Sequence, residues 1–137
     1  MQPGSITLVG TGIAAGAHLT AEARIALERA EEVFYVVTEP AGAAALERLN
    51  PNTRSLVELY REGVPRAEIY AEMARQIVDS AVAGKRVCAA FYGHPGVFAS
   101  PSHEAVRRAR AEGFPATMLP AISAEDCLFA DLGVGRL

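Results

Sequence analysis

The sequence predicts an α/β domain with a mainly parallel five-stranded sheet and flanking helices. Three observations predict this fold. Short apolar runs alternate along the chain with longer amphipathic runs, which is typical of a parallel sheet covered by helices. Several of the short runs are apolar at nearly every position, as expected for strands buried on both faces. The length suits one domain with a sizeable core, over residues 1–137.

The first two strands are predicted on either side of a glycine loop and a helix. Residues 5–9 are a compact β-branched run, and the glycine-rich residues 10–16 end the strand that this run predicts. Thr20 is a suitable N-cap for a helix whose apolar positions recur at helical spacing as far as Ala30. Residues 33–37 are all apolar or aromatic, which predicts the second strand.

The middle of the chain predicts two helices and a weaker strand. A short helix is expected from Pro40 to Leu49, and Pro51 ends it because the residue before a proline rarely stays helical. Residues 55–59 predict a weaker third strand. An amphipathic pattern over residues 66–83 predicts a long helix, with a glycine placed at its C-terminal end.

The last part of the chain repeats the alternation twice. The expected strand, helix, strand and helix lie over residues 86–91, 100–112, 116–119 and 124–132. Ser100 and Pro101 suit the N-cap and first turn of the first of these helices. Ser123 suits the N-cap of the second, and Asp126 stands three residues later in an arrangement close to a capping box.

Composition and charge exclude several classes of protein. The net charge is −3 and the basic residues form no run, so no nucleic-acid platform is expected. The two cysteines, Cys88 and Cys127, make neither a disulfide scaffold nor a metal-binding pattern, and we expect no metal. No apolar stretch is long enough to cross a membrane, and the first residues show no secretory signal. We therefore expect a cytoplasmic protein.

Three loops should converge at the carboxyl ends of the strands, where open parallel sheets bind their ligands. These loops comprise residues 10–16, 92–98 and 120–123. The first does not have the spacing of a dinucleotide-binding loop, because Ala15 stands where the third glycine is needed. A tight turn between strand and helix is the simpler interpretation of this loop.

The second loop, residues 92–98, contains two glycines and a proline within four positions. Such residues impose an unusual backbone path and let a ligand approach the main chain closely. His94 lies inside this loop, where it either contacts a ligand or bonds to the local backbone.

Three polar residues near the start of the long helix suggest acid–base chemistry. Arg66 and Tyr70 are four residues apart and share one helix face, and Tyr60 lies just upstream. An arginine beside a phenol favours the phenolate and lowers the pKa of the phenol, which would make Tyr70 a base. The alternative is that these side chains only pack on the surface.

Two strings of residues are far more specific than a glycine loop: FYGHPGVF at residues 91–98 and ISAEDCLFADL at residues 122–132. Both closely resemble the borosin peptide-backbone α-N-methyltransferases, which belong to the tetrapyrrole (corrin/porphyrin) methyltransferase superfamily. Residues 4–10 and 33–37 match as well, as does the tyrosine–arginine set, so the resemblance covers essentially the whole chain. His94 favours the peptide-modifying branch, because tetrapyrrole methylases commonly carry an acidic residue there.

The resemblance implies S-adenosylmethionine-dependent methylation of backbone amides in a precursor peptide. The peptide is fused to the enzyme in some members, and the split arrangement fits here because no candidate core peptide follows Leu137. The resemblance also implies a catalytic set, in which Tyr70 with Arg66 is the base and Tyr60 and Tyr92 donate hydrogen bonds to the amide oxygen. The residues that would line the cofactor pocket are Tyr92, His94, Val97, Phe98, Ser123 and Ala124.

The resemblance is to the amino-terminal one of the superfamily's two α/β domains, and the second is absent from these 137 residues. A homodimer or a partner chain would then supply the missing wall of the cofactor pocket. Two alternatives stay open. One is a methyltransferase of the same superfamily that acts on a tetrapyrrole or another small molecule. The other is a non-catalytic half-domain that binds a peptide or a partner subunit.

Overall fold

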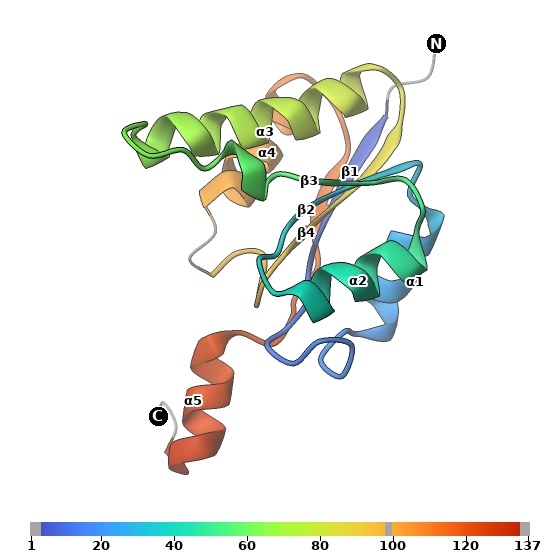
Figure 1. The fold of residues 1–137 in the computed structure, drawn as a ribbon. Coiled ribbons are helices and arrows are strands. Elements are labelled where there is room, and N and C mark those ends of the chain that lie inside the picture. Colours follow the sequence, from blue (N-terminus) through green and yellow to red (C-terminus); the bar gives the residue numbers. More distant parts are fainter. Residues whose placement is uncertain (1–3, 98–99, 135–137) are drawn as a thin grey trace.

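The computed structural model describes residues 4–97 and 100–134 of the chain (Figure 1). Strands and helices alternate along most of it. The strands are β1 (Ser5–Gly10), β2 (Glu32–Val36), β3 (Thr53–Ser55), β4 (Arg86–Phe91) and β5 (Ala116–Met118). The helices are α1 (Ala21–Arg29), α2 (Pro40–Leu49), α3 (Arg66–Val82), α4 (Ser100–Ala111) and α5 (Ala124–Leu132), with a short 3-10 helix, η1, over Val57–Leu59.

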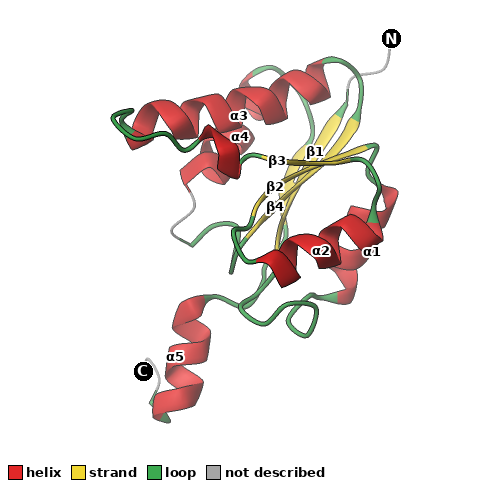
Figure 2. Cartoon of the chain, in the orientation of Figure 1, coloured by secondary structure: helices red, strands yellow, loops and turns green. Residues whose placement is uncertain are grey.

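The strands form one parallel sheet in the order β3-β2-β4-β1-β5 (Figure 2). The central strand is β4, in which Ala90 pairs with Val9 of β1 on one side and with Tyr35 of β2 on the other. Because all the strands run in the same direction, their carboxyl ends meet at one edge, where ligand-binding loops gather in open parallel sheets. The predicted fold class is confirmed.

Helices cover both faces of the sheet (Figure 1). Neighbouring residues of one strand point to opposite faces. Phe34 of β2 packs with Met73 of α3 and Ala105 of α4 in one apolar cluster. Val33, the residue before it, packs with Leu27 of α1 in a second cluster, to which α2 also contributes. The continuous apolar run of β2 is therefore explained by burial on both sides.

The strand predicted over residues 55–59 is wrong. β3 ends at Ser55, and the 3-10 helix η1 begins two residues later. Leu56 turns the chain, because its backbone has φ −99° and ψ −2° while its side chain is buried. The Ser55 hydroxyl accepts a hydrogen bond from the N–H of Val57 at 3.2 Å, which stabilises the turn. A buried leucine in a turn has the same apolar signal as a leucine in a strand.

Caps define where several helices begin. The Thr20 hydroxyl accepts a hydrogen bond from the Ala23 N–H at 3.0 Å, so the predicted N-cap of α1 is confirmed. Ser123 and Asp126 form a complete capping box at the start of α5, which confirms that prediction. Ser100 is already helical in α4 (Ser100–Ala111), so it is not the predicted N-cap.

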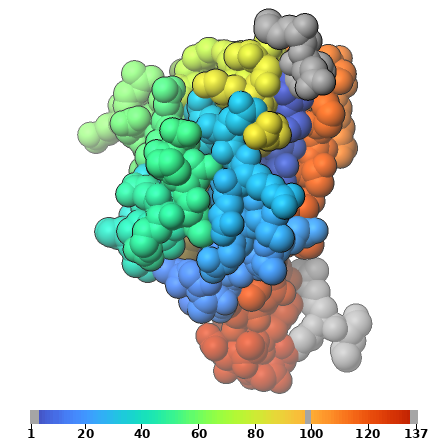
Figure 3. All heavy atoms as spheres, turned by 90° about the vertical axis from the view of Figure 1, so that its right-hand side faces the viewer, coloured from blue at the N-terminus to red at the C-terminus, as the bar shows by residue number. Residues whose placement is uncertain are grey.

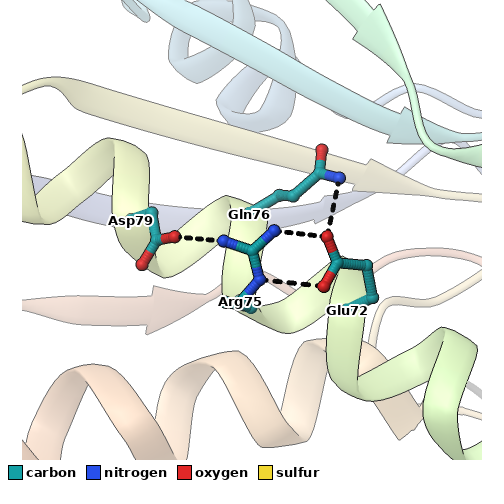
Figure 4. Close-up of polar contacts among 4 residues, drawn as sticks. All are labelled: Glu72, Arg75, Gln76 and Asp79. Carbon is teal, nitrogen blue, oxygen red and sulfur yellow. Dashed lines mark hydrogen bonds and ion pairs between the residues drawn. The ribbon is translucent and has the colours of Figure 1, made fainter.

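Charged side chains form a network along the exposed side of α3 (Figure 4). The Arg75 guanidinium donates to Asp79 at 2.6 Å and, through Nε, to Glu72 at 2.8 Å, while the Gln76 amide donates to Glu72 at 3.2 Å. The hydrogen bonds that Glu72 accepts, first from Arg75 and then from Gln76, lower the pKa of its carboxyl to about 2. Pairs at this spacing stabilise an exposed helix modestly.

Helix α5 extends away from the rest of the domain, as Figures 1 and 3 show. None of its residues, all of which the structure describes, is buried. Leu128 and Leu132 lie one turn apart on this helix and are 53% and 63% exposed. The other four α-helices each bury residues in the domain.

Across the described residues, no helix is both long enough and apolar enough to cross a lipid bilayer.

Candidate functional site

The three loops at the carboxyl edge of the sheet meet, as predicted. Gly12 and Gly93 form an antiparallel bridge, in which each N–H donates to the carbonyl oxygen of the other at 3.2 and 3.1 Å. Gly10, at the end of β1, fits tightly between the other two loops. A Cβ at this position would lie 2.0 Å from the Gly93 oxygen and 2.6 Å from the Cβ of Ala121. Only a residue without a side chain allows this close approach.

A pocket of about 240 Å³ lies at this edge of the sheet. Its walls come from the ends of β2 and β4, from the adjoining loops, and from the first turns of α3, α4 and α5. The predicted site residues that line it are Tyr60, Tyr70, Tyr92, His94, Val97, Ser123 and Ala124. Phe98, the remaining predicted cofactor residue, lies outside the described residues.

Sequence reasoning missed part of the wall. The missed lining residues are Ile13, Val36, Phe91, Gly93 and Pro101. Val36 and Phe91 are the last residues of β2 and β4, so the rule that ligands bind at the carboxyl ends of strands could have found them. Ile13 and Pro101 carry no such signal, because their place in the wall depends on how the loops fold over the sheet.

The structure brings Tyr60, Arg66 and Tyr70 together. The Arg66 guanidinium donates a hydrogen bond from Nη1 to the Tyr70 phenol oxygen at 3.2 Å. Its Cζ also lies 5.8 Å from the centroid of the Tyr60 ring, which is within the range of a cation–π contact. The two phenol rings pack edge to face, with centroids 6.3 Å apart and planes at 88°. Arg66 therefore contacts two of the tyrosines in the pocket wall.

These contacts move the pKa values of the two phenols in opposite directions. The hydrogen bond from Arg66 is the largest cause that lowers the pKa of Tyr70. Partial burial, followed by the charge that Tyr70 would carry, raises the pKa of Tyr60. As the pH rises, Tyr70 therefore ionises before Tyr60, and the wall can hold a proton acceptor beside a proton donor.

His94 bonds to the backbone of its own loop. Its Nδ1 accepts a hydrogen bond from the Gly96 N–H at 2.9 Å, and the half-buried side chain also lines the pocket. The hydrogen bond assigns the tautomer, because a neutral imidazole that accepts at Nδ1 carries its proton on Nε2. The predicted backbone bond is confirmed, and contact between His94 and a ligand stays a prediction.

Ser123 uses its hydroxyl to begin α5. The Ser123 Oγ accepts from the Asp126 N–H at 3.2 Å and donates to the Asp126 carboxylate at 3.0 Å. The same carboxylate accepts from the Ser123 N–H at 2.8 Å, and this bond is the largest cause that lowers the pKa of Asp126. Ser123 therefore places the start of α5, with Ala124, in the wall of the pocket.

In the parts of the chain that the structure describes, no three His, Cys, Asp or Glu side chains are grouped to hold a metal ion. Cys88 is buried within the sheet, and burial raises the pKa of its thiol to about 12. A thiol that stays protonated near neutral pH is a poor nucleophile. Cys88 is therefore a small core residue.

Known sequences similar to this chain are methyltransferases. Residues 5–135 match the family described as Tetrapyrrole (Corrin/Porphyrin) Methylases. The chain is 47% identical over 131 residues to the methyltransferase/ribosomally synthesized type I borosin cyclic peptide precursor of Coprinopsis marcescibilis, with 96% of this chain and 34% of that protein aligned. It is 46% identical over 129 residues to the methyltransferase/ribosomally synthesized cyclic peptide omphalotin A precursor of Omphalotus olearius, with 94% and 31% aligned. The chain thus spans about a third of the length of these curated relatives.

Solved structures share the fold. The uroporphyrin-III-C-methyltransferase of Thermus thermophilus superposes with a TM-score of 0.68 at 25% identity, over 98% of this chain and 55% of that one. A diphthine synthase superposes with a TM-score of 0.74 over 95% of this chain and 49% of that one, and at 16% identity it shows the fold alone. The family match over residues 5–135 includes both the sheet and the loops that form the pocket. The chain therefore belongs to the tetrapyrrole (corrin/porphyrin) methylase family.

Proposed function

We propose that this chain carries the methyl-transfer site of an S-adenosylmethionine-dependent enzyme that methylates backbone amide nitrogens in a precursor peptide. The observation that carries the proposal is the set of Tyr60, Arg66 and Tyr70, which pairs a phenol of lowered pKa with a phenol of raised pKa in the pocket wall. The names of the relatives combine a methyltransferase with a cyclic peptide precursor, which supports a peptide substrate.

Several features of the pocket support S-adenosylmethionine as its ligand. Apolar walls are provided by Val36, Phe91 and Val97. Gly93 has φ +75°, and a Cβ there would lie 3.7 Å from Cδ1 of Ile13, so a side chain would fill space that a ligand can use. His94 has Nε2–H available as a donor to a polar part of the cofactor. Further cofactor contacts would come from Tyr92, Ser123 and Ala124. When bound, S-adenosylmethionine supplies an electrophilic methyl group on its sulfonium.

The amide nitrogen must lose its proton in this reaction, because its lone pair is delocalised into the carbonyl group. In our proposal the Tyr70 phenolate accepts that proton, so the amide N–H bond breaks as the phenol O–H bond forms. The hydrogen bond from Arg66 stabilises the phenolate and fixes its orientation. Tyr70 is thus the catalytic base, and Arg66 is a positioning residue that acts through it.

Loss of the proton places negative charge on the amide oxygen, and two phenols can stabilise it. Tyr60 keeps its proton when Tyr70 is ionised, because its own pKa is raised. Tyr92 lies in the pocket wall and is 48% exposed, so an incoming peptide can reach it. In our proposal Tyr60 and Tyr92 donate hydrogen bonds to the amide oxygen as its charge develops.

We also propose that a second protein surface completes the pocket, from a second domain or from another copy of the chain in a homodimer. The exposed side chains of Tyr92, Leu128 and Leu132 support this, because a partner would cover the apolar surface that they present. The free thiols of Cys88 and Cys127 support a reducing, cytoplasmic location.

Methylation of a tetrapyrrole or another small molecule is the alternative within the family. Its support is the similarity to the uroporphyrin-III-C-methyltransferase of Thermus thermophilus. Transfer to a ring carbon requires no base for an amide proton, so this alternative leaves the Arg66–Tyr70 pair without a role. A non-catalytic half-domain leaves the pair without a role too.

Intact-mass measurement tests the proposal. The chain and S-adenosylmethionine are incubated with a synthetic peptide that covers the precursor segment of the Omphalotus olearius relative. The reaction is run with the chain alone and with the remaining methyltransferase portion of that relative added as a second chain. We expect the peptide to gain mass in steps of one methyl group when both are present. Peptide binding without any mass gain in either reaction would contradict the proposal and indicate a half-domain.

A further inference from the structure

His18 closes the glycine loop that follows β1. Its imidazole Nδ1 accepts hydrogen bonds from the backbone N–H groups of Ile13 and Ala14, both at 3.0 Å. An imidazole that accepts at Nδ1 in this way is neutral and carries its proton on Nε2. One acceptor therefore ties two successive amides of the loop to the segment that leads into α1.

The loop is shaped around this side chain. Gly12 has φ +69°, and a Cβ there would lie 2.1 Å from the Cβ of His18, so glycine is needed for the approach. The His18 N–H in turn donates to the Ala14 oxygen at 3.2 Å. Both the backbone and the ring of His18 thus bond to the loop.

The part of the loop that His18 holds forms one wall of the pocket. Ile13 lines the pocket beside Gly93, and its Cδ1 lies 3.7 Å from the point that a Cβ of Gly93 would occupy. Gly12 forms the backbone bridge with Gly93. A displacement of the Ile13 amide would therefore move both this wall and the loop opposite.

Two adjacent N–H groups that converge on one point make the kind of concavity in which other loops bind a phosphate. Here the lone pair of His18 occupies that point. Both amides therefore stabilise the loop and do not face a ligand. The loop contributes the apolar side chain of Ile13 to the pocket. A ligand without phosphate groups suits such a wall.

We infer that His18 is a positioning residue for the pocket. Its neutral imidazole holds the Ile13 and Ala14 amides so that the Ile13 side chain forms a wall against the S-adenosyl group. The identity of that group rests on the proposed function, whereas the contacts of His18 do not.

NMR on the isotope-labelled full chain tests the contact itself. The imidazole nitrogen shifts of His18 should report a proton on Nε2 and an acceptor at Nδ1. Hydrogen exchange at the Ile13 and Ala14 amides should be slow in the wild type and about tenfold faster in His18→Leu. A proton on Nδ1, or exchange that is equally fast in both proteins, would overturn the inference.

Two variants separate positioning from folding. His18→Asn places an amide oxygen at about the location of Nδ1 and can accept the same hydrogen bonds, whereas His18→Leu keeps the bulk and has no acceptor. The labelled chain is titrated with S-adenosylmethionine after the remaining methyltransferase portion of the Omphalotus olearius relative is added as a second chain. The Ile13 and Gly93 amide signals should show a dissociation constant about tenfold higher in His18→Leu and within about threefold of wild type in His18→Asn. Equal weakening in both variants, or none in His18→Leu, would refute the inference.

The two measurements also distinguish this inference from the proposed function. If S-adenosylmethionine shifts no amide signal of the wild type even with that second chain added, the proposed cofactor site is wrong. The tautomer of His18 and the exchange rates at Ile13 and Ala14 are measured without cofactor, so they still decide whether His18 holds the loop.

Discussion

Arg66 and Tyr70 lie one turn apart on α3 and are joined by a hydrogen bond of 3.2 Å from the guanidinium to the phenol oxygen. This bond is the largest cause that lowers the pKa of Tyr70. Tyr60, whose ring packs against that of Tyr70, has its pKa raised, first by partial burial and then because its ionisation would place a second negative charge beside the first. One wall of the pocket therefore holds a proton acceptor, Tyr70, beside a proton donor, Tyr60.

The methylation rate should rise with pH. The active form of Tyr70 is the phenolate, which is populated above its pKa, and Arg66 lowers that pKa. In Arg66→Gln the positive charge is lost, so the rising part of the pH–rate profile should move to higher pH. Single-turnover rates measured across the alkaline range, at saturating cofactor, check this shift. A profile that is the same in both proteins would mean that Arg66 does not tune the base.

Two arginines of α3 allow a matched comparison. Arg66→Ala should lower the single-turnover rate by about 10²–10⁴-fold, because Tyr70 would then ionise too little near neutral pH. Arg75→Ala should leave the rate close to wild type, because Arg75 pairs with Glu72 and Asp79 along the helix surface. Equal losses in the two variants would indicate a general effect on α3.

The double variant of Arg66 and Tyr70 should be scarcely slower than either single one, because the two act as a unit.

The chain alone should bind S-adenosylmethionine weakly or not at all. In our account part of the cofactor wall comes from a second protein surface, and losing about 3–4 kcal/mol of contacts weakens binding by several hundred-fold. Calorimetry of the chain, with and without the remaining methyltransferase portion of a relative, measures this difference. Micromolar binding by the monomeric chain would show that the pocket needs no second surface.

Helix α5 should take part in self-association. Leu128 and Leu132 expose apolar surface on a helix that buries none of its residues, so we expect assemblies larger than the 14.5 kDa monomer. Leu128→Lys and Leu132→Lys should dissociate them, whereas Ala130→Lys, a change at another exposed position of the helix, should not. Light scattering over a range of concentrations checks the mass. A wild type that stays monomeric at high concentration would count against a homodimer.

Much of the fold could be predicted because the strands at the centre of the sheet are covered on both sides. Residues 86–91 are predicted as a strand and form β4, and all but the first are buried. At β3, an edge strand of the sheet, the apolar pattern in the sequence is weaker. Only Ser55 of the predicted strand over residues 55–59 belongs to β3, because burial of Leu56 is achieved by a turn and not by pairing with a neighbour. An apolar residue in the sequence does not reveal whether a turn or a strand buries it.

The site could be predicted where it depends on spacing within one helix. Arg66 and Tyr70 share a helix face whatever the rest of the fold does, so their contact follows from their positions. The edge-to-face contact of Tyr60 depends on the path of the loop before α3. The bonds from Ile13 and Ala14 to His18 depend on the shape of a tight loop, which residue types alone do not specify.

The variant Tyr70→Phe tests whether Tyr70 removes the amide proton. The change removes only the hydroxyl, so folding and cofactor binding should be retained, while Tyr92→Phe should lose only about 10²-fold as one donor among several. The measurement is single-turnover methylation of the precursor peptide by mass spectrometry, at saturating cofactor, with the completed two-domain enzyme. If Tyr70 is the base, the rate for Tyr70→Phe should be about 10²–10⁴-fold below wild type. A rate near that of the wild type would contradict it and leave Tyr70 with no role as a base.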